Sequence, residues 1–298
     1  MRMNERNSEV WCMTATLRQM MLGLLLGAAA LAAWSFPTMY GDTGVVLIPS
    51  ADVAHELRMD AAVGVMRMSQ TNGGTYGFPI RVNYGATGNL ELSGLVSESH
   101  GPAPGAENVQ VVGGGAKFSL HQEKFDSQVP GAAIGARYFR TARGEWGNTD
   151  VMEGYGVLSK ILYQAGDQLD TGYVIRAHAG AYYRYYKMET TNCATMAPFV
   201  GITYRSYTGM SVAADFIPQE SMLSKDVTFD LQAHPITDPP NAAVFSVMFR
   251  QPLSDNFTIE AGITRPFGFT KDNSFYLGLN YHYGEIYNSG ERRAPVLF

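Results

Sequence analysis

The stretch SFYLGLNYHYG at 274–284 alternates strictly between apolar and polar side chains. Phe275 and Leu277 fall on one parity, and Ser274 and Asn280 fall on the other. Because successive side chains of a β-strand point to opposite faces, the stretch predicts a strand with one apolar and one polar face. The fold then depends on whether the apolar face packs in a protein core or contacts lipid.

The same two-residue period recurs in about twelve segments, each roughly ten residues long, which is typical of membrane β-barrels. Turn-rich links separate the segments, and short links alternate with long ones such as 98–108, 140–152 and 218–242. This pattern predicts an all-β fold, a transmembrane antiparallel up-and-down β-barrel of about 12 strands. The predicted strands are Leu57–Arg67, Thr75–Tyr84, Asn89–Ser97, Val109–Leu120, Val129–Phe139, Glu153–Tyr163, Gly172–Tyr185, Met196–Tyr204, Met210–Ile217, Ala243–Pro252, Phe257–Thr264 and Ser274–Tyr283.

Two segments leave the strand count open. Val227–His234 also alternates, and we assign it to the long external loop as a strand extension. A fourteen-strand barrel, with an added strand near TGVVLIP at 43–49, is the alternative.

Nearly every predicted strand carries an ionisable residue near its middle, on the polar parity only. A soluble sandwich would also alternate, but tyrosines at strand ends, including Tyr76 and Tyr155, favour a lipid–water interface. A charge facing lipid at mid-bilayer costs about 2–4 kcal/mol, so one-sided charges predict a wet lumen. The predicted lumen-lining residues are Arg58, Arg81, Glu91, Lys117, Arg137, Lys160, Arg176, His178, Asp215, Arg250 and Glu260.

The charges counted on the predicted strands are mostly basic. They comprise eight basic residues, the seven above and Arg184, against Asp60, Glu91, Asp215 and Glu260. Because charged rings set the preference of a pore, this excess predicts a weak preference for anionic solutes. The alternative is a salt-bridged interior that blocks the pore.

The N-terminal residues have the pattern of a secretory signal peptide. Arg18 precedes the apolar run MMLGLLLGAAALAA, and we expect cleavage after Ser35; a membrane-anchoring helix is the alternative. The predicted organisation is a signal peptide at 1–35, an N-terminal periplasmic segment at 36–56, the barrel at 57–283 and a C-terminal periplasmic tail at 284–298. Localisation in the outer membrane of a Gram-negative envelope follows.

Composition excludes several function classes. Beyond residue 35 the chain has 19 basic and 25 acidic residues, which argues against nucleic acid as a partner. Only Cys193 remains there, so no internal disulfide is expected. Since no His-x-Ser motif, metal-ligand spacing or phosphate loop is visible, we expect no enzyme, no cofactor and no metal, and interpret His178 and His282 as polar lumen groups. A lipid-modifying enzyme is the least favoured alternative.

The last predicted strand also carries an assembly pattern. Tyr276, Gly278, Tyr281 and Tyr283 resemble the C-terminal signal that the outer-membrane barrel assembly machinery reads, although a polar tail follows it here. Outer-membrane lipids and this machinery are therefore expected partners.

The stretch GDTGVVLIPSADVAHE at 41–56 resembles the N-terminal motif of the YjbH-like outer-membrane barrels, with Val45 in place of Leu and Ser50 in place of Thr. NLELSGLV and VPGAAIGARYF are similar to strands of that family. The resemblance implies a barrel linked to exopolysaccharide production and export, without established catalytic residues, and with polysaccharide or export proteins as candidate partners. The expected function is a narrow channel or envelope component; a structural barrel that binds a partner through its external loops is the alternative.

Overall fold

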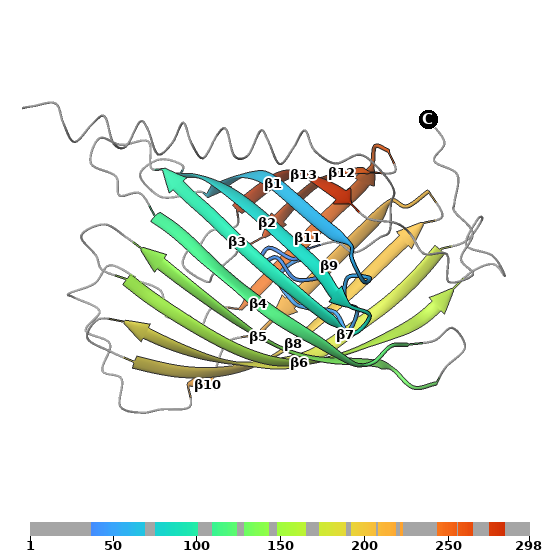
Figure 1. The fold of residues 1–298 in the computed structure, drawn as a ribbon, viewed down its shortest axis with the longest axis horizontal. Helices are drawn as coiled ribbons and strands as arrows, with labels where there is room; N and C mark the ends of the chain where they lie inside the picture. Colours follow the sequence, from blue (N-terminus) through green and yellow to red (C-terminus); the bar gives the residue numbers. More distant parts are fainter. Residues whose placement is uncertain are drawn as a thin grey trace, which may run out of the picture.

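The computed structural model describes residues 37–68, 75–100, 109–123, 128–142, 148–164, 173–188, 192–206, 208–218, 221–222, 243–254, 256–264 and 274–283. Within these ranges the chain forms one antiparallel sheet that closes into a barrel (Figure 1). Its strands are β1 (Met59–Met68), β2 (Thr75–Thr87), β3 (Leu90–His100), β4 (Val109–His121), β5 (Gly131–Ala142), β6 (Asn148–Gln164), β7 (Tyr173–Met188), β8 (Asn192–Ser206), β9 (Ser211–Ile217), β10 (Ser221–Met222), β11 (Val244–Pro252), β12 (Phe257–Thr264) and β13 (Ser274–Tyr283).

Closure is made by β1 and β13, which pair from Met59↔Tyr283 to Met68↔Ser274. The two-residue β10 pairs with β8 alone, whereas β9 pairs with both β8 and β11. Twelve of the thirteen strands therefore make the wall. A closed wall leaves no unpaired strand edge, which is what a lipid environment requires of a sheet.

The twelve-strand prediction is confirmed, since each predicted segment overlaps one wall strand. The prediction of a long link at 140–152 is wrong in part, because β5 continues to Ala142 and β6 begins at Asn148. The fourteen-strand alternative is wrong, because residues 43–49 make only isolated bridges, such as Gly44↔Pro49, and join no strand of the wall. Val227–His234, residues 1–36 and residues 284–298 lie outside the described residues.

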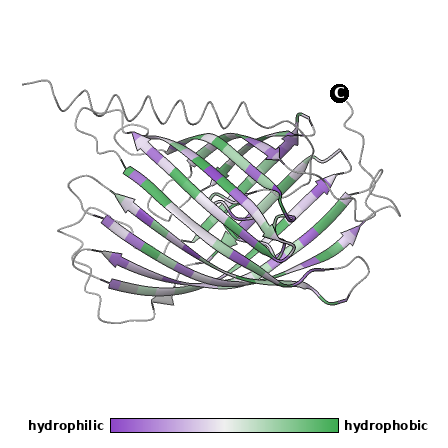
Figure 2. Cartoon of the chain, in the orientation of Figure 1, coloured by the Kyte–Doolittle hydropathy of each residue, from purple (hydrophilic) through white to green (hydrophobic). Residues whose placement is uncertain are grey.

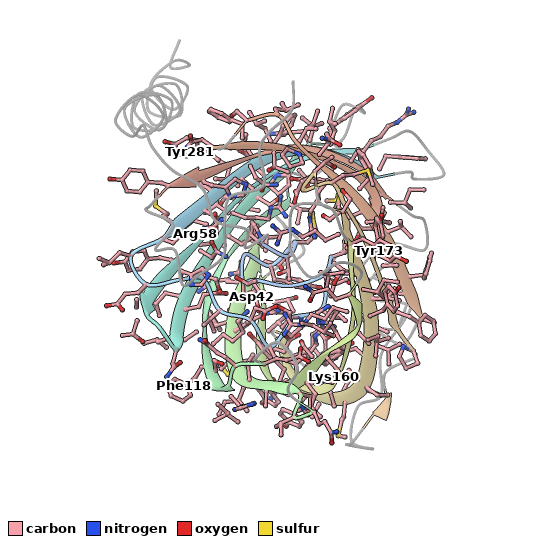
Figure 3. All side chains as sticks on the ribbon, turned by 90° about the vertical axis from the view of Figure 1, so that its right-hand side faces the viewer. Asp42, Arg58, Phe118, Lys160, Tyr173 and Tyr281 are labelled. Atoms are coloured by element: carbon pink, nitrogen blue, oxygen red, sulfur yellow. The ribbon has the colours of Figure 1, made fainter. Side chains whose placement is uncertain are left out.

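The two faces of the wall differ in chemistry, and Figure 2 shows the hydropathy alternating along the strands. Large apolar side chains point outward, among them Phe275 at 64% exposure and Leu277 at 55%. Looking along the barrel, Phe118 and Tyr281 lie on the outside, whereas Asp42 lies in the interior (Figure 3). The apolar face is therefore on the outside of the barrel, and among the described residues no protein core covers it. Among the described residues, no helix is long and apolar enough to cross a membrane.

Residues 37–56, which we call the lumen segment, lie inside the barrel (Figures 1 and 3). The predicted N-terminal periplasmic segment, residues 36–56, therefore lies in the lumen from residue 37 onward, and its periplasmic location stays a prediction. Val45, Val46 and Ile48 are buried, and Glu56 bridges to Gly85 where the segment leaves the lumen. We call this end of the barrel, which holds Arg58 and Tyr283, the terminal end, and the opposite end the far end. The chain reverses direction at Leu57, with φ of 60°, before β1 begins.

Candidate functional site: the lumen and its inserted segment

Asp42 of the lumen segment lies against a cluster of wall residues on β5 and β6. Arg137 Nη2 donates to Asp42 Oδ1 at 2.7 Å and Oδ2 at 2.6 Å, and Tyr155 Oη donates to Oδ2 at 2.7 Å. Arg137 Nη1 donates to Glu153 at 2.9 Å, and Arg184 Nε donates to the other oxygen of Glu153 at 2.5 Å. The wall alone thus holds two guanidinium groups and one carboxylate here, and Asp42 supplies the missing negative charge.

The electrostatics keep Asp42 ionised. Burial acts to raise the pKa of Asp42, but Arg137, Lys117 and a hydrogen bond from Thr38 hold that pKa below its ordinary value of 3.8. The carboxylate is therefore charged at neutral pH, and its attraction to Arg137 is strong because both groups are buried.

Tyr40 of the lumen segment covers the other side of the same arginine. Its ring lies 4.9 Å from the Arg137 guanidinium carbon and 5.3 Å from the ring centroid of Phe139. Tyr155 lies on Arg137 from the wall, 4.7 Å from the guanidinium carbon. Arg137 is thus enclosed by two aromatic rings and two carboxylates.

At Asp215 of β9 the charges are arranged the other way round, because here the wall supplies the carboxylate and the lumen segment supplies the hydrogen-bond donors. Its Oδ2 accepts hydrogen bonds from three successive backbone N–H groups, those of Val46 at 3.1 Å, Leu47 at 2.6 Å and Ile48 at 3.2 Å. Successive amide groups that converge on one anion form a nest. Here the lumen segment forms the nest, and Asp215 of the wall is the anion.

Three cations of the wall bind backbone carbonyl groups of the segment. Arg81 donates to the carbonyls of Pro37 at 3.2 Å and Thr38 at 3.1 Å, and Arg250 donates to that of Val45 at 2.5 Å. Lys117 donates to the carbonyl of Thr43 at 2.7 Å. Their remaining charge is balanced within the wall, because Glu260 lies between Arg81 and Arg250. Glu91 lies 3.4 Å from Lys117 and also accepts the N–H groups of Thr43 and Ala54.

The lumen segment adds a buried carboxylate, that of Asp42, to the charged side chains of the wall. The wall side chains are Arg58, Arg81, Lys117, Arg137, Arg184 and Arg250 against Asp60, Glu91, Glu153, Asp215 and Glu260. These are six basic and five acidic groups, and Glu123, whose side chain is 1% exposed, adds a sixth acidic group at the terminal end, where it pairs with Arg176. The role of Asp42 is therefore local, as the second carboxylate beside Arg137. The predicted basic excess is therefore wrong for the closed lumen, because Glu153 was not counted and Asp42 lies inside.

Most of the predicted lumen-lining residues lie inside the barrel. The buried ones are Arg58, Arg81, Glu91, Lys117, Arg137, His178, Asp215, Arg250 and Glu260. Arg176 is half-buried at the terminal end, where it pairs with Asp52 of the lumen segment and with Glu123.

Lys160 departs from the prediction. It follows the buried Ser159 directly, so it lies on the outward row of β6, and its Nζ reaches Glu123 at 2.9 Å near the terminal end. Val157 is also buried and points inward, and a bulge between Ile161 and Tyr163 returns Tyr163 to the outside. Tyr155 is likewise buried in the lumen rather than placed at the outer interface.

The contribution of Asp42, Asp52, Glu153 and Tyr155 was missed by sequence reasoning. Glu153 and Tyr155 share the parity of Ser159, so the alternation of β6 could have revealed them if the bulge had been recognised. No local pattern places Asp42 or Asp52 in the lumen.

Two histidines lie in hydrogen-bonded groups that no sequence spacing indicated. His178 Nδ1 lies 2.8 Å from Ser159 Oγ, which also accepts the N–H of Ala51. His282 Nδ1 lies 2.6 Å from Asp60, which also accepts from Arg58. Ser159 is 1% exposed and is bonded to the lumen segment, so this group fixes the segment in the present state and offers no accessible nucleophile.

The predicted assembly residues lie on both faces of β13. Tyr276 points inward, where its hydroxyl contacts Arg81, and its ring occupies the space beside Gly278. Tyr283 points outward and is exposed. Recognition by the assembly machinery stays a prediction. Within the described ranges, no cluster of His, Cys, Asp and Glu side chains could hold a metal ion.

The inner wall becomes apolar next to Arg137. The polar row, which runs across paired strands β3 to β7, comprises Ser93, Gly115, Arg137, Glu153 and Arg184. The next inward row toward the far end, the apolar row, comprises Leu95, Gly113, Phe139, Val151 and Tyr186. A Cβ on Gly113 would lie 2.2 Å from Phe139, and one on Gly115 would lie 3.0 Å from Arg137, so these glycines allow both side chains to cross β4.

Comparison with known proteins gives structural likeness only. No family model matches the chain, and no curated protein matches it. Among solved structures it is similar to the NanC porin (14% identity, 75% of this chain and 98% of that chain, TM-score 0.47). It is also similar to the KdgM porin in complex with disordered oligogalacturonate (11%, 76% and 98%, TM-score 0.43). A third structure is an outer membrane channel from Pseudomonas putida F1 (12%, 80% and 99%, TM-score 0.44). At such identities and TM-scores, these likenesses assign no function to this chain.

Proposed function

We propose that the chain is an outer-membrane β-barrel channel whose lumen is closed by its own residues 37–56. Support for the membrane location comes from the wall, which exposes large apolar side chains on its outside and pairs every wall strand on both sides. Support for closure comes from the lumen segment, whose Asp42 binds the buried Arg137 and Tyr155 of the wall. The latter observation carries the proposal, because a wall built to stay open would not need a carboxylate from the N-terminal segment.

The contacts also allow the lumen segment to leave the lumen and return. Within the described residues, the segment is joined covalently to the wall through Leu57 and β1, and its other contacts with the wall are hydrogen bonds, ion pairs and apolar packing. Release would expose Arg137 and Asp215 to water, which would solvate both charges. The free-energy cost of releasing the segment is therefore lower than it would be if Arg137 and Asp215 stayed buried without a partner.

A disulfide lock tests the proposal. A Cβ at Gly131 of β5 would lie 3.4 Å from the Cβ of Ala51 in the lumen segment, close to the separation found in disulfides. The variant Ala51→Cys/Gly131→Cys, in a Cys193→Ser background, should form this bond in oxidising conditions. The matched controls are the two single-cysteine variants in the same background.

Conductance in planar bilayers is the readout. We expect the unlocked protein to show intermittent conducting steps, the oxidised double variant to show almost none, and reduction to restore them. Equal conductance of the oxidised and reduced double variant would mean that the lumen segment does not close the channel. An absence of steps in the unlocked protein and in a variant lacking residues 37–50 would show that the barrel is not a channel.

The link to exopolysaccharide export stays a prediction, since it depends on the YjbH-like resemblance alone. The alternatives, a structural barrel that binds a partner through external loops and a lipid-modifying enzyme, have no contact among the described residues in their favour. A non-enzymatic channel is the function that the lumen supports best.

A further inference from the structure

We infer that the wall around Arg137 is a binding site for a small aromatic carboxylate, and that Tyr40 and Asp42 of the lumen segment occupy this site as an internal ligand mimic. The inference rests on the proposed function, because a solute reaches the site only after the segment has moved. It adds the chemical class of the solute and the residues that recognise it.

The carboxylate half of the site is built from the wall. Arg137 Nη2 contacts both oxygens of Asp42, and Tyr155 Oη donates to one of them. Both wall side chains are buried, and Arg137 is oriented by its second bond, to Glu153. A guanidinium held in place beside a phenol hydroxyl is suited to a carboxylate, because it offers several fixed N–H and O–H donors.

The aromatic half lies directly beside it. The ring of Tyr40 lies on Phe139, at 5.3 Å between centroids, and over Arg137 at 4.9 Å. Phe139 belongs to the apolar row, which continues with Leu95 and Val151. The wall thus places an apolar surface one inward row from a carboxylate-binding arginine.

The side chains of Tyr40 and Asp42 are held close together by the backbone of the lumen segment, as the two groups of a single ligand would be. Residues 38–42 form a tight turn, in which Thr38 N donates to the carbonyl of Asp42 at 2.5 Å and Gly41 N donates to that of Thr38 at 3.0 Å. Because the turn is closed, the ring of Tyr40 and the carboxylate of Asp42 reach the wall together. A free ligand needs the same two groups, a ring and a carboxylate joined by a short linker, so 4-hydroxyphenylacetate is a suitable probe.

Binding is measured by calorimetry on the complete chain in detergent, without reference to conductance. The variant Tyr40→Ala/Asp42→Asn removes the mimic and keeps the wall. We expect saturable binding of 4-hydroxyphenylacetate to this variant, and binding at least tenfold weaker to the unmodified protein. Acetate, which lacks the ring, and tyramine, which has a cation in place of the carboxylate, should bind at least tenfold more weakly than the probe.

Wall variants locate the site. In the Tyr40→Ala/Asp42→Asn background, Arg137→Gln should abolish binding, and the milder Tyr155→Phe should weaken it roughly tenfold, since it removes one hydrogen bond to a charged group. Heat-modifiable gel mobility shows that each variant is folded. The inference is wrong if tyramine binds as tightly as 4-hydroxyphenylacetate. It is also wrong if the folded Tyr155→Phe and Arg137→Gln variants bind 4-hydroxyphenylacetate with unchanged affinity. These outcomes are independent of whether the barrel conducts ions, so they separate this inference from the proposed function.

Discussion

Arg137 of β5 holds Asp42 of the lumen segment through hydrogen bonds of 2.7 and 2.6 Å to its two carboxylate oxygens. The two residues are 95 positions apart in the sequence, and each is buried. The pair joins the wall of the barrel to the chain that fills it. Predictions about closure therefore begin with this contact.

The substitution Asp42→Asn removes the negative charge and keeps the size of the side chain. Hydrogen bonds to a charged group contribute about 1.5–3 kcal/mol, so the ratio of open to closed barrels should rise roughly ten- to a hundredfold. Single-channel recording of the open probability checks this. Asp150→Asn is the matched control, because Asp150 binds the exposed Tyr138. A rise of equal size in both variants would contradict the role given to Asp42.

Gly41→Ala should also loosen the lumen segment. Gly41 has φ of 102°, and a Cβ there would lie 2.7 Å from the backbone carbonyl oxygen of Gly94. The substitution is therefore both strained and sterically opposed by β3, and roughly 1 kcal/mol or more should be lost from the closed state. Protease sensitivity of residues 37–56 in folded protein is the measurement. Gly88→Ala serves as control, because no atom lies within 4 Å of its added Cβ, and it should leave the cleavage rate unchanged.

Protonation of Asp42 should favour the open barrel at low pH. The pKa of Asp42 is below 3.8 in the closed state, whereas a released segment has the ordinary value, so protons bind the released state more tightly. The stabilisation by Asp42 is complete above about pH 4 and is lost as the pH falls below 3.8 toward the closed-state pKa. We expect the difference in open probability between the unmodified protein and Asp42→Asn to be constant between about pH 5 and 8 and to vanish as the pH falls below about 4. A difference between the two proteins that persists at pH 3 would contradict the role given to Asp42.

The outward face should tolerate charge only near its edges. Leu277 lies in the middle of β13 and is 55% exposed, whereas Leu120 lies next to the last residue of β4 and is 59% exposed. If lipid surrounds the wall, Leu277→Arg should cost about 2–4 kcal/mol of unfolding free energy and Leu120→Arg about 0–1 kcal/mol. Urea unfolding in lipid vesicles measures both. Equal costs would show that the outer face does not contact a membrane interior.

The period of two by itself determined the strands, because the alternation of side chains between faces is a local property of extended chain. It placed Arg81, Glu260 and Arg250 on one face and Leu277 on the other, and it therefore predicted the closed wall. It failed at Lys160, since both parities of β6 carry apolar residues and a bulge shifts the register after Ile161.

The position of residues 37–56 was decided only by the tertiary structure. No periodicity marks this segment, and its place follows from contacts across the lumen, such as those of Asp42 with Arg137 and of Val46 with Asp215. A buried charge is stable only when a partner is near in space, whatever its distance along the chain. Most of the wall charges, although not Glu153, could therefore be predicted from the sequence, but the binding of Arg137 by the chain's own N-terminal segment could not.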